Sequence, residues 1–164
     1  MRWKHLPNLT LIALAVSYFI QVGAGVFALA VVGRVVSAAP PRSLAMLEGA
    51  YRYDSSAFWQ ITPAITGTLF LLSIAANWQS RRRTLLLGAF AAFVLSGVVT
   101  GAALSPLFAD IAAVGYGDSV DPDLQRRAAI WYVSDWGVRC FDAIAGVALL
   151  IALTRPASDR AVAA

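Results

Sequence analysis

Three long stretches without any charged side chain constrain this chain more than any other feature of its sequence. Residues 5–33, 55–80 and 84–109 contain no Asp, Glu, Lys or Arg. Each stretch exceeds the roughly 20 apolar residues that an α-helix needs to cross the hydrocarbon layer of a membrane. Of the 164 residues, 59% are hydrophobic and 13% are charged, whereas a soluble domain is about 45–50% apolar and about 25% charged. The sequence therefore excludes an ordinary soluble domain and predicts an integral membrane protein.

A fourth apolar stretch, residues 143–154, is too short to cross a membrane by itself. It can span only if its helix extends back through Asp142, Arg139 and Asp135. The pair Asp121-Pro122 is a helix-start signal, with Asp as the N-cap and Pro in the first turn, so this helix can also begin outside the membrane. We predict an all-α membrane protein, a four-transmembrane-helix antiparallel bundle with a partly ordered outer loop helix. The expected helices lie near 8–33, 57–80, 84–107 and 131–154.

The whole of 1–155 is expected to form one membrane domain, followed by a frayed cytoplasmic tail at 156–164. With the N-terminus inside, the inner side carries seven basic residues and the outer side five. The inner seven are Arg2, Lys4, Arg81, Arg82, Arg83, Arg155 and Arg160. Three of them are consecutive in a very short loop, where the positive-inside rule has most weight. We therefore predict a multi-pass protein of the cell membrane with both termini cytoplasmic. The first stretch is expected to be an uncleaved anchor, because a signal peptide has an apolar core of only about 7–15 residues.

The first outer loop is expected to contain a short helix. Ser43 can cap it, and Glu48 can pair with Arg52 four residues later on one face. The residues expected on its apolar face are Leu44, Leu47 and Tyr51.

The most informative pattern lies on the fourth helix. Trp131, Asp135, Arg139, Asp142 and Gly146 are spaced by three or four residues and therefore form one stripe. A charge in the bilayer centre costs at least about 2.5–3.5 kcal/mol, so these groups must face the bundle or a watery cavity. One interpretation is an outward-opening polar pocket in which Arg139, Asp135 and Asp142 are the catalytic or ligand-orienting groups. The other is a self-neutralised ion cluster that holds the helices together.

The other three helices offer residues that can face this stripe. The first helix offers Gln21, and the second a polar stripe that includes Thr62 and Thr66. Three tryptophans that flank the polar stripes, Trp59, Trp131 and Trp136, are candidates for the wall of a binding pocket. On the third helix, Gly97 and Gly101 form a GxxxG pattern, which favours close contact between helices within the chain. Pro63 either starts the second helix, with Thr62 as cap, or kinks it.

Several classes of site and partner are excluded by what the sequence lacks. The chain has one Cys, Cys140, and one His, His5, so it can form neither an intrachain disulfide nor a zinc site built from His and Cys ligands. We expect no metal and no organic cofactor. The formal net charge is +4, but the basic residues end apolar stretches, where membrane topology explains them. Nucleic acid is therefore not an expected partner.

Three short motifs resemble the anthrone-oxygenase-like membrane proteins, a four-helix family. They are Gln21-Val-Gly23-Ala-Gly25 on the first helix, Ser105-Pro106-Leu107 after the third, and Trp136-Gly-Val-Arg139 on the fourth. The similarity covers about residues 11–155 and implicates Trp136 and Arg139. Oxygenases of that family convert polycyclic phenolic anthrones to anthraquinones without a bound metal or organic cofactor. Members often have Asn close behind the Pro, whereas here the first polar residue is Asp110.

Two functions are consistent with this sequence. The first is a membrane protein with an outward-facing pocket for an apolar aromatic or quinone-like molecule, which as an enzyme would be a cofactor-free oxygenase. The second is a non-enzymatic accessory or structural protein that binds lipid, a second copy or another membrane protein. The residues expected to contact the small molecule are Trp136, Trp131, Trp59, Gln21, Thr62 and Thr66.

Overall fold

A computed structural model describes residues 5–156 of the chain, and these residues form helices and loops with no strand. Four helical segments in this part of the chain are long and apolar enough to cross a membrane, which confirms the predicted all-α four-helix membrane fold. They run over Leu6–Ala38, Ser56–Ala76, Arg83–Ala112 and Pro122–Thr154. The predicted tail, except Pro156, lies outside the described residues, as do Arg2, Lys4 and Arg160.

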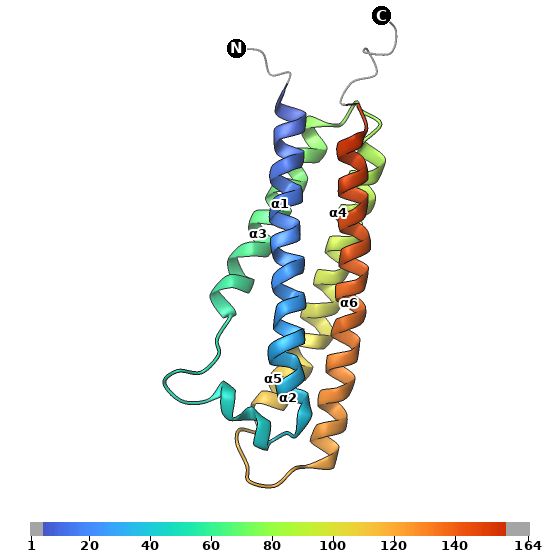
Figure 1. The fold of residues 1–164 in the computed structure, drawn as a ribbon. Coiled ribbons are helices and arrows are strands. Elements are labelled where there is room, and N and C mark those ends of the chain that lie inside the picture. The colour runs from blue at the N-terminus through green and yellow to red at the C-terminus, as the bar shows by residue number, and fades with distance from the viewer. Residues whose placement is uncertain (1–4, 157–164) are drawn as a thin grey trace, which may run out of the picture.

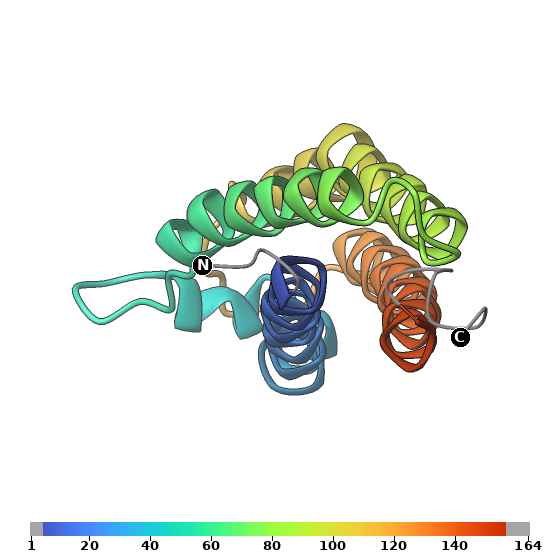
Figure 2. The same cartoon turned by 90° about the horizontal axis from the view of Figure 1, so that it is seen from above.

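The four segments run alternately up and down (Figure 1). We call the end where the first segment begins and the last one finishes the terminal end, and the opposite end the loop end. Helix α1 (Leu6–Phe27) packs against α3 (Ser56–Ala76) and α6 (Pro122–Thr154), and α6 also packs against α4 (Arg83–Val99). Viewed along the bundle, α3 and α4 diverge toward the loop end (Figure 2). The cytoplasmic location of the terminal end remains a prediction.

Two of the spans contain a π-helical segment that the sequence does not indicate. In the first span, α1 continues through η2 (Ala28–Gly33) into α2 (Arg34–Ala38). In the third, α4 continues through η4 (Thr100–Leu104) into α5 (Ser105–Ala112). Pro106 lies two residues after the end of η4, and its missing N–H removes one regular helical hydrogen bond there. Both spans are therefore longer than the predicted 8–33 and 84–107.

The last helix begins at the predicted start signal. The Asp121 side chain accepts hydrogen bonds from the backbone N–H groups of Asp123 (2.8 Å) and Leu124 (3.3 Å), and α6 starts at Pro122. At 1.5 Å per residue its 33 residues extend about 50 Å, more than the ~30 Å of a hydrocarbon core. The helix is therefore longer than one perpendicular crossing needs. The second span is shorter than predicted, because α3 ends at Ala76 and the turn 77–82 follows.

The first outer loop differs from the prediction in its details. Its helix, η3 (Arg42–Leu47), is a 3₁₀ helix that ends before Tyr51, which is fully exposed. Ser43 does not cap it, because the Ser43 hydroxyl donates to the carbonyl of Val36 at 2.8 Å. The Glu48 carboxylate accepts the backbone N–H of Tyr116 at 2.6 Å and so joins the two outer loops. No ion pair with Arg52 forms among the described residues, since Glu48 has left the helix.

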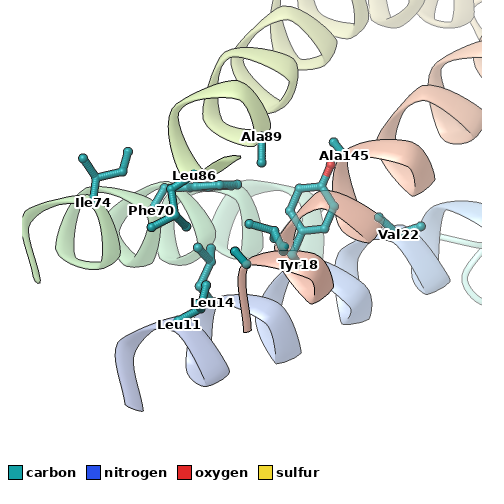
Figure 3. Close-up of a cluster of buried hydrophobic side chains, with 11 residues drawn as sticks. Leu11, Leu14, Tyr18, Val22, Phe70, Ile74, Leu86, Ala89 and Ala145 are labelled. Atoms are coloured by element: carbon teal, nitrogen blue, oxygen red, sulfur yellow. The ribbon is translucent and has the colours of Figure 1, made fainter. Parts of the chain in front are cut away.

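The interior consists of two separate apolar clusters. The terminal-end core, shown in Figure 3, contains Leu11, Leu14, Tyr18, Val22, Phe70, Ile74, Leu86, Ala89, Ala145, Leu149 and Ala152. The loop-end core contains Leu29, Val32, Val36, Leu44, Leu104, Ile111, Leu124, Ala128 and Trp131. All four spans contribute to the first, whereas α3 contributes no residue to the second within the described part of the chain. The two cores leave a region between them in which the charged stripe of α6 lies.

A buried arginine closes the terminal end. Arg82 is 4% exposed, and its guanidinium donates to the carbonyl of Arg155 and to the side-chain oxygen of Asn8 at 2.6 Å. Nearby, the Asn77 amide donates to the carbonyl of Pro7 at 3.2 Å. These bonds connect the ends of α1 and α6 to the turn between α3 and α4.

Replacing Arg82 tests how much these hydrogen bonds contribute to the stability of the protein. We expect Arg82→Ala to lower the free energy of unfolding by about 2–3 kcal/mol, because it strands buried acceptors that now receive charged hydrogen bonds. Arg83→Ala is the control, since Arg83 lies over the Trp78 ring at 5.2 Å and loses only a cation–π contact of about 0.5–1 kcal/mol. Unfolding followed by circular dichroism in detergent measures both. Equal effects of the two changes would contradict a special role for Arg82.

Candidate functional site

The charged stripe of α6 forms a compact buried ion cluster. Arg139 contacts Asp135 and Asp142, each at a nitrogen–oxygen distance of 3.0 Å. Arg139 and Asp142 are 8% and 6% exposed, although no acidic or basic residue of another helix pairs with them among the described residues. The predicted pairing within the stripe is therefore confirmed. When all three groups are ionised, their formal charges sum to −1.

The first helix shapes the space that this cluster occupies. A methyl group built at Gly25 would lie 2.8 Å from Cδ of Arg139, so the missing side chain makes room for the arginine. The Tyr18 hydroxyl donates to the backbone carbonyl of Asp142 at 3.0 Å. Sequence reasoning missed Tyr18, although it shares a helix face with Gln21 and Gly25 at spacings of three and seven.

A cavity of about 830 Å³ lies beside the ion cluster, between the two cores. Residues of all four spans line it, as do Leu47 and residues 53–55 of the first outer loop. Its volume is within the range of about 300–1,000 Å³ that is usual for sites of small molecules. The sequence predicts a polar pocket at this place; the wall contains all three charged residues of the cluster, but most of its surface is apolar.

Six of the nine predicted site residues line this cavity. They are Arg139, Asp135, Asp142, Trp131, Trp59 and Gln21. The ring of Trp131 packs against Phe108 with their centroids 4.8 Å apart, and Phe108 also lines the cavity. The cavity wall therefore combines one ion cluster with aromatic rings from α3, α5 and α6.

The other three predicted residues lie elsewhere. Trp136 does not line the cavity; its ring centroid lies 6.3 Å from that of Tyr132, and the side chain packs against the loop-end core. Thr66 is fully buried, and its hydroxyl pairs with that of Ser17 at 2.8 Å between α1 and α3. The Thr62 hydroxyl donates to the carbonyl of Phe58, one turn earlier, at 2.7 Å. Thr66 and Thr62 thus satisfy local polar groups and do not line the cavity.

Pro63 lies inside α3 and does not start it. The alternative in which Thr62 caps the helix is therefore wrong, since α3 begins seven residues earlier, at Ser56. Pro63 lacks an N–H group, so the carbonyl of Trp59 loses its usual helical donor. Both residues line the cavity.

The GxxxG pattern predicts close contact between helices, and this prediction is wrong. A methyl group built at Gly97 or at Gly101 would meet no atom within 4 Å. Both glycines line the cavity, so the pattern leaves space open on α4 and η4. The two π-helical segments, η2 and η4, also contribute to the wall, and such segments are frequent at functional sites.

One buried polar atom at the cavity, the side-chain oxygen of Gln21, has no hydrogen-bond partner among the described residues. A buried acceptor without a partner costs about 1–3 kcal/mol, so such atoms are usually satisfied by water or a ligand. Three of the five N–H groups of Arg139 donate to the two carboxylates, and the structure pairs the other two with no acceptor among the described residues.

The rim at the loop end carries a negative charge. Asp54 is exposed, lines the cavity and accepts the backbone N–H of Ser56 at 2.9 Å. Hydrogen bonding to Ser56 lowers the pKa of the Asp54 carboxyl below its ordinary value, so it is ionised at neutral pH. In the described part of the chain, no group of three or more His, Cys, Asp or Glu side chains could hold a metal ion.

The arrangement can therefore hold a flat apolar molecule against aromatic rings and offer N–H donors to an oxygen on it. The four apolar spans support a membrane protein. Comparison of the chain with family models, with curated proteins and with solved structures finds no match.

Proposed function

We propose that this protein binds an apolar aromatic or quinone-like small molecule in the cavity beside Arg139. The observation that carries the proposal is the cavity itself, which has the volume of a small-molecule site and places an ion cluster among aromatic rings. A ring of the ligand would stack between Trp59 and the Phe108–Trp131 pair. An oxygen of the ligand would accept the unused N–H groups of Arg139, a charge-assisted bond worth about 1.5–3 kcal/mol.

The net charge of the cluster selects the kind of ligand. Because the cluster has a formal charge of −1, an anionic ligand would be repelled by the two carboxylates that flank Arg139. A neutral carbonyl or phenol escapes this repulsion. The proposed ligand is therefore uncharged and carries at least one oxygen on an aromatic or quinonoid ring.

The resemblance to anthrone-oxygenase-like proteins extends the proposal to catalysis. A carboxylate of the cluster, Asp135 or Asp142, would take a proton from the substrate, and Arg139 would stabilise the oxyanion that forms. With molecular oxygen as oxidant, an anthrone gives an anthraquinone and one molecule of water. No metal or organic cofactor is part of this proposal.

Ligand-dependent thermal stabilisation tests the binding step. We expect a neutral naphthoquinone or anthrone at saturating concentration to raise the Tm of the purified protein by about 5 °C. The double variant Gly97→Leu/Gly101→Leu places two side chains in the cavity and should weaken binding at least about 10-fold, because the lost volume excludes the ring. Absence of a shift across neutral phenols, quinones and anthrones would overturn the proposal.

A groove on the outside of the bundle favours the alternative function. It has a volume of about 450 Å³ and lies between α4 and α6, lined by small and apolar residues that include Gly88, Ala92 and Ala148. Small residues let membrane helices approach closely, so a second copy or another membrane protein fits here. A protein with this groove as its main site would be a non-enzymatic accessory protein.

One matched pair of variants separates the two functions. Gly88, like Gly97, is on α4 and has no atom within 4 Å of an added methyl group. Gly88→Leu fills the groove and leaves the cavity unchanged, so it should preserve ligand binding and abolish any co-purifying subunit seen by native mass spectrometry. Loss of ligand binding in Gly88→Leu, or of a subunit in Gly97→Leu/Gly101→Leu, would reverse the assignment.

A further inference from the structure

Helix α3 closes the bundle at one end only. Its buried residues Phe70 and Ile74 belong to the terminal-end core, and the Phe70 ring contacts those of Phe90 and Phe93 on α4. Toward the loop end, no residue of α3 joins the loop-end core among the described residues. Figures 1 and 2 show the same divergence of α3 from α4.

The cavity lies where these helices diverge. On one side, α3 contributes Ser56, Trp59 and Pro63 to the wall. On the other side, α4 and η4 contribute Gly97 and Gly101, at which an added methyl group would meet nothing. We call the space between these two sets of residues the side mouth of the cavity.

The outer surfaces of the two helices that border the side mouth are apolar. Large apolar side chains next to it are exposed on the outside of both helices, among them Ile61 (59%), Ile65 (50%) and Val98 (58%). All three are within segments that can span a membrane. Exposed side chains of this kind at this depth are in contact with lipid, because water would leave them unfavourably solvated.

The loop end offers a less favourable path. At this end the Asp121 N–H donates to the Pro40 carbonyl at 3.0 Å and joins the two outer loops, and the Gln125 amide on α6 donates to the Ala38 carbonyl at the end of α2 at 2.8 Å. The rim there carries the ionised Asp54. An apolar molecule dissolved in water would have to pass this charge, whereas one dissolved in lipid reaches the side mouth past exposed apolar side chains of α3 and α4, such as Ile61 and Val98.

We infer that the cavity is reached sideways from the lipid, through the side mouth between the first turns of α3 and the Gly97–Gly101 segment, so that its ligand is a molecule dissolved in the leaflet at the loop end. This inference rests on the proposed function for the identity of the ligand. Its geometry can be tested without any ligand. Gly97 and Gly101 keep the passage wide, because any larger side chain there would stand in it.

Thiol reactivity in lipid nanodiscs, which expose both membrane faces, provides the test. Cysteine is introduced by Gly97→Cys, and separately by Gly101→Cys, after Cys140→Ser has removed the exposed native thiol. Two reference variants bracket the result: Tyr51→Cys in the fully exposed outer loop, and Ile144→Cys on α6, where the native side chain is 70% exposed at membrane depth. The probes are a charged, water-soluble thiosulfonate and a pyrene maleimide in phosphatidylcholine nanodiscs with nitroxide-labelled acyl chains.

At both mouth positions the charged reagent should react at least about 10-fold more slowly than at position 51, because thiolate formation and a charged reagent are both disfavoured in hydrocarbon. Pyrene at position 97 should be quenched by acyl-chain nitroxide as strongly as pyrene at position 144. Reaction at positions 97 and 101 as fast as at position 51, with little quenching, would show a water-filled mouth and overturn the inference.

Two variants, Gly97→Cys and Gly101→Cys, are used so that a folding defect in one of them leaves the other to be tested. The Tm of each is measured first. Failure of the proposed function is distinguishable from failure of this inference. If no aromatic molecule stabilises the protein but the thiols lie in lipid, the route from lipid is supported and the proposed ligand is wrong. If aromatic molecules bind but the thiols react as in water, the proposed function stands and the route from lipid is wrong.

Discussion

Arg139→Ala should produce the largest loss of stability among single substitutions in this protein. It removes the cation that pairs with both Asp135 and Asp142 and leaves two largely buried carboxylates without a compensating charge. Breaking a buried ion pair by removing one partner costs about 3–5 kcal/mol. We expect a decrease of this size in the free energy of unfolding, measured in detergent, together with loss of the ligand-dependent Tm shift.

A charge-free variant separates stability from binding. Asp135→Leu/Arg139→Met/Asp142→Leu replaces the cluster by apolar side chains of similar size and removes every charge and every N–H donor. It should recover most of the stability, because replacing a whole buried ion cluster is often close to neutral. It should not recover ligand binding, because the N–H groups of Arg139 are gone. If Arg139→Ala were as stable as the native protein, the cluster would be water-solvated and the buried geometry would be contradicted.

Gly25→Ala is the second change with a large expected effect. The added methyl group would lie 2.8 Å from Cδ and 3.1 Å from Nη1 of Arg139, on a side chain fixed by two carboxylates. Arg139 must therefore shift and lose part of its pairing. We expect a destabilisation of about 1–3 kcal/mol, as for other overpacked sites. Ligand affinity should fall with it, because the displaced arginine no longer presents its N–H groups to the cavity.

The control is two residues away on the same helix. A methyl group at Gly23 would meet no atom within 4 Å. Gly23→Ala should therefore leave ligand binding unchanged and be neutral or stabilising by up to about 1 kcal/mol, because Ala favours the helix. Thermal unfolding of both variants, with and without the naphthoquinone, measures the contrast. Similar behaviour of the two would contradict the role of Gly25 as the space for Arg139.

The α6 stripe shows how much of a site one helix can reveal. Asp135, Arg139 and Asp142 are close in sequence, so helical geometry alone predicted their pairing, and the structure confirms it. The N-cap at Asp121 was equally predictable, because the cap uses only neighbouring backbone N–H groups. Such local features depend on the spacing of residues and on nothing else in the chain.

Contacts between helices were much less predictable. Trp136, Thr62 and Thr66 have the residue types of a site, but the rotation of their helices turns them toward other partners. Gly97 and Gly101 have the pattern of a helix contact, yet α3 diverges from them and leaves open space. The rotation and tilt of each helix follow from the packing of all four, which no single stretch of sequence contains.

The sequence by itself determined the solvent and the architecture of this protein. Three charge-free stretches and a fourth with a paired charge stripe can bury their backbone polar groups in lipid only as helices. Only the tertiary structure decided that the bundle has two cores, that α3 belongs to one of them, and that a cavity remains between them. The physical reason is that the backbone hydrogen bonds of a helix form within one segment. A cavity depends instead on how the side chains of several segments pack, and it remains where they do not fill the space.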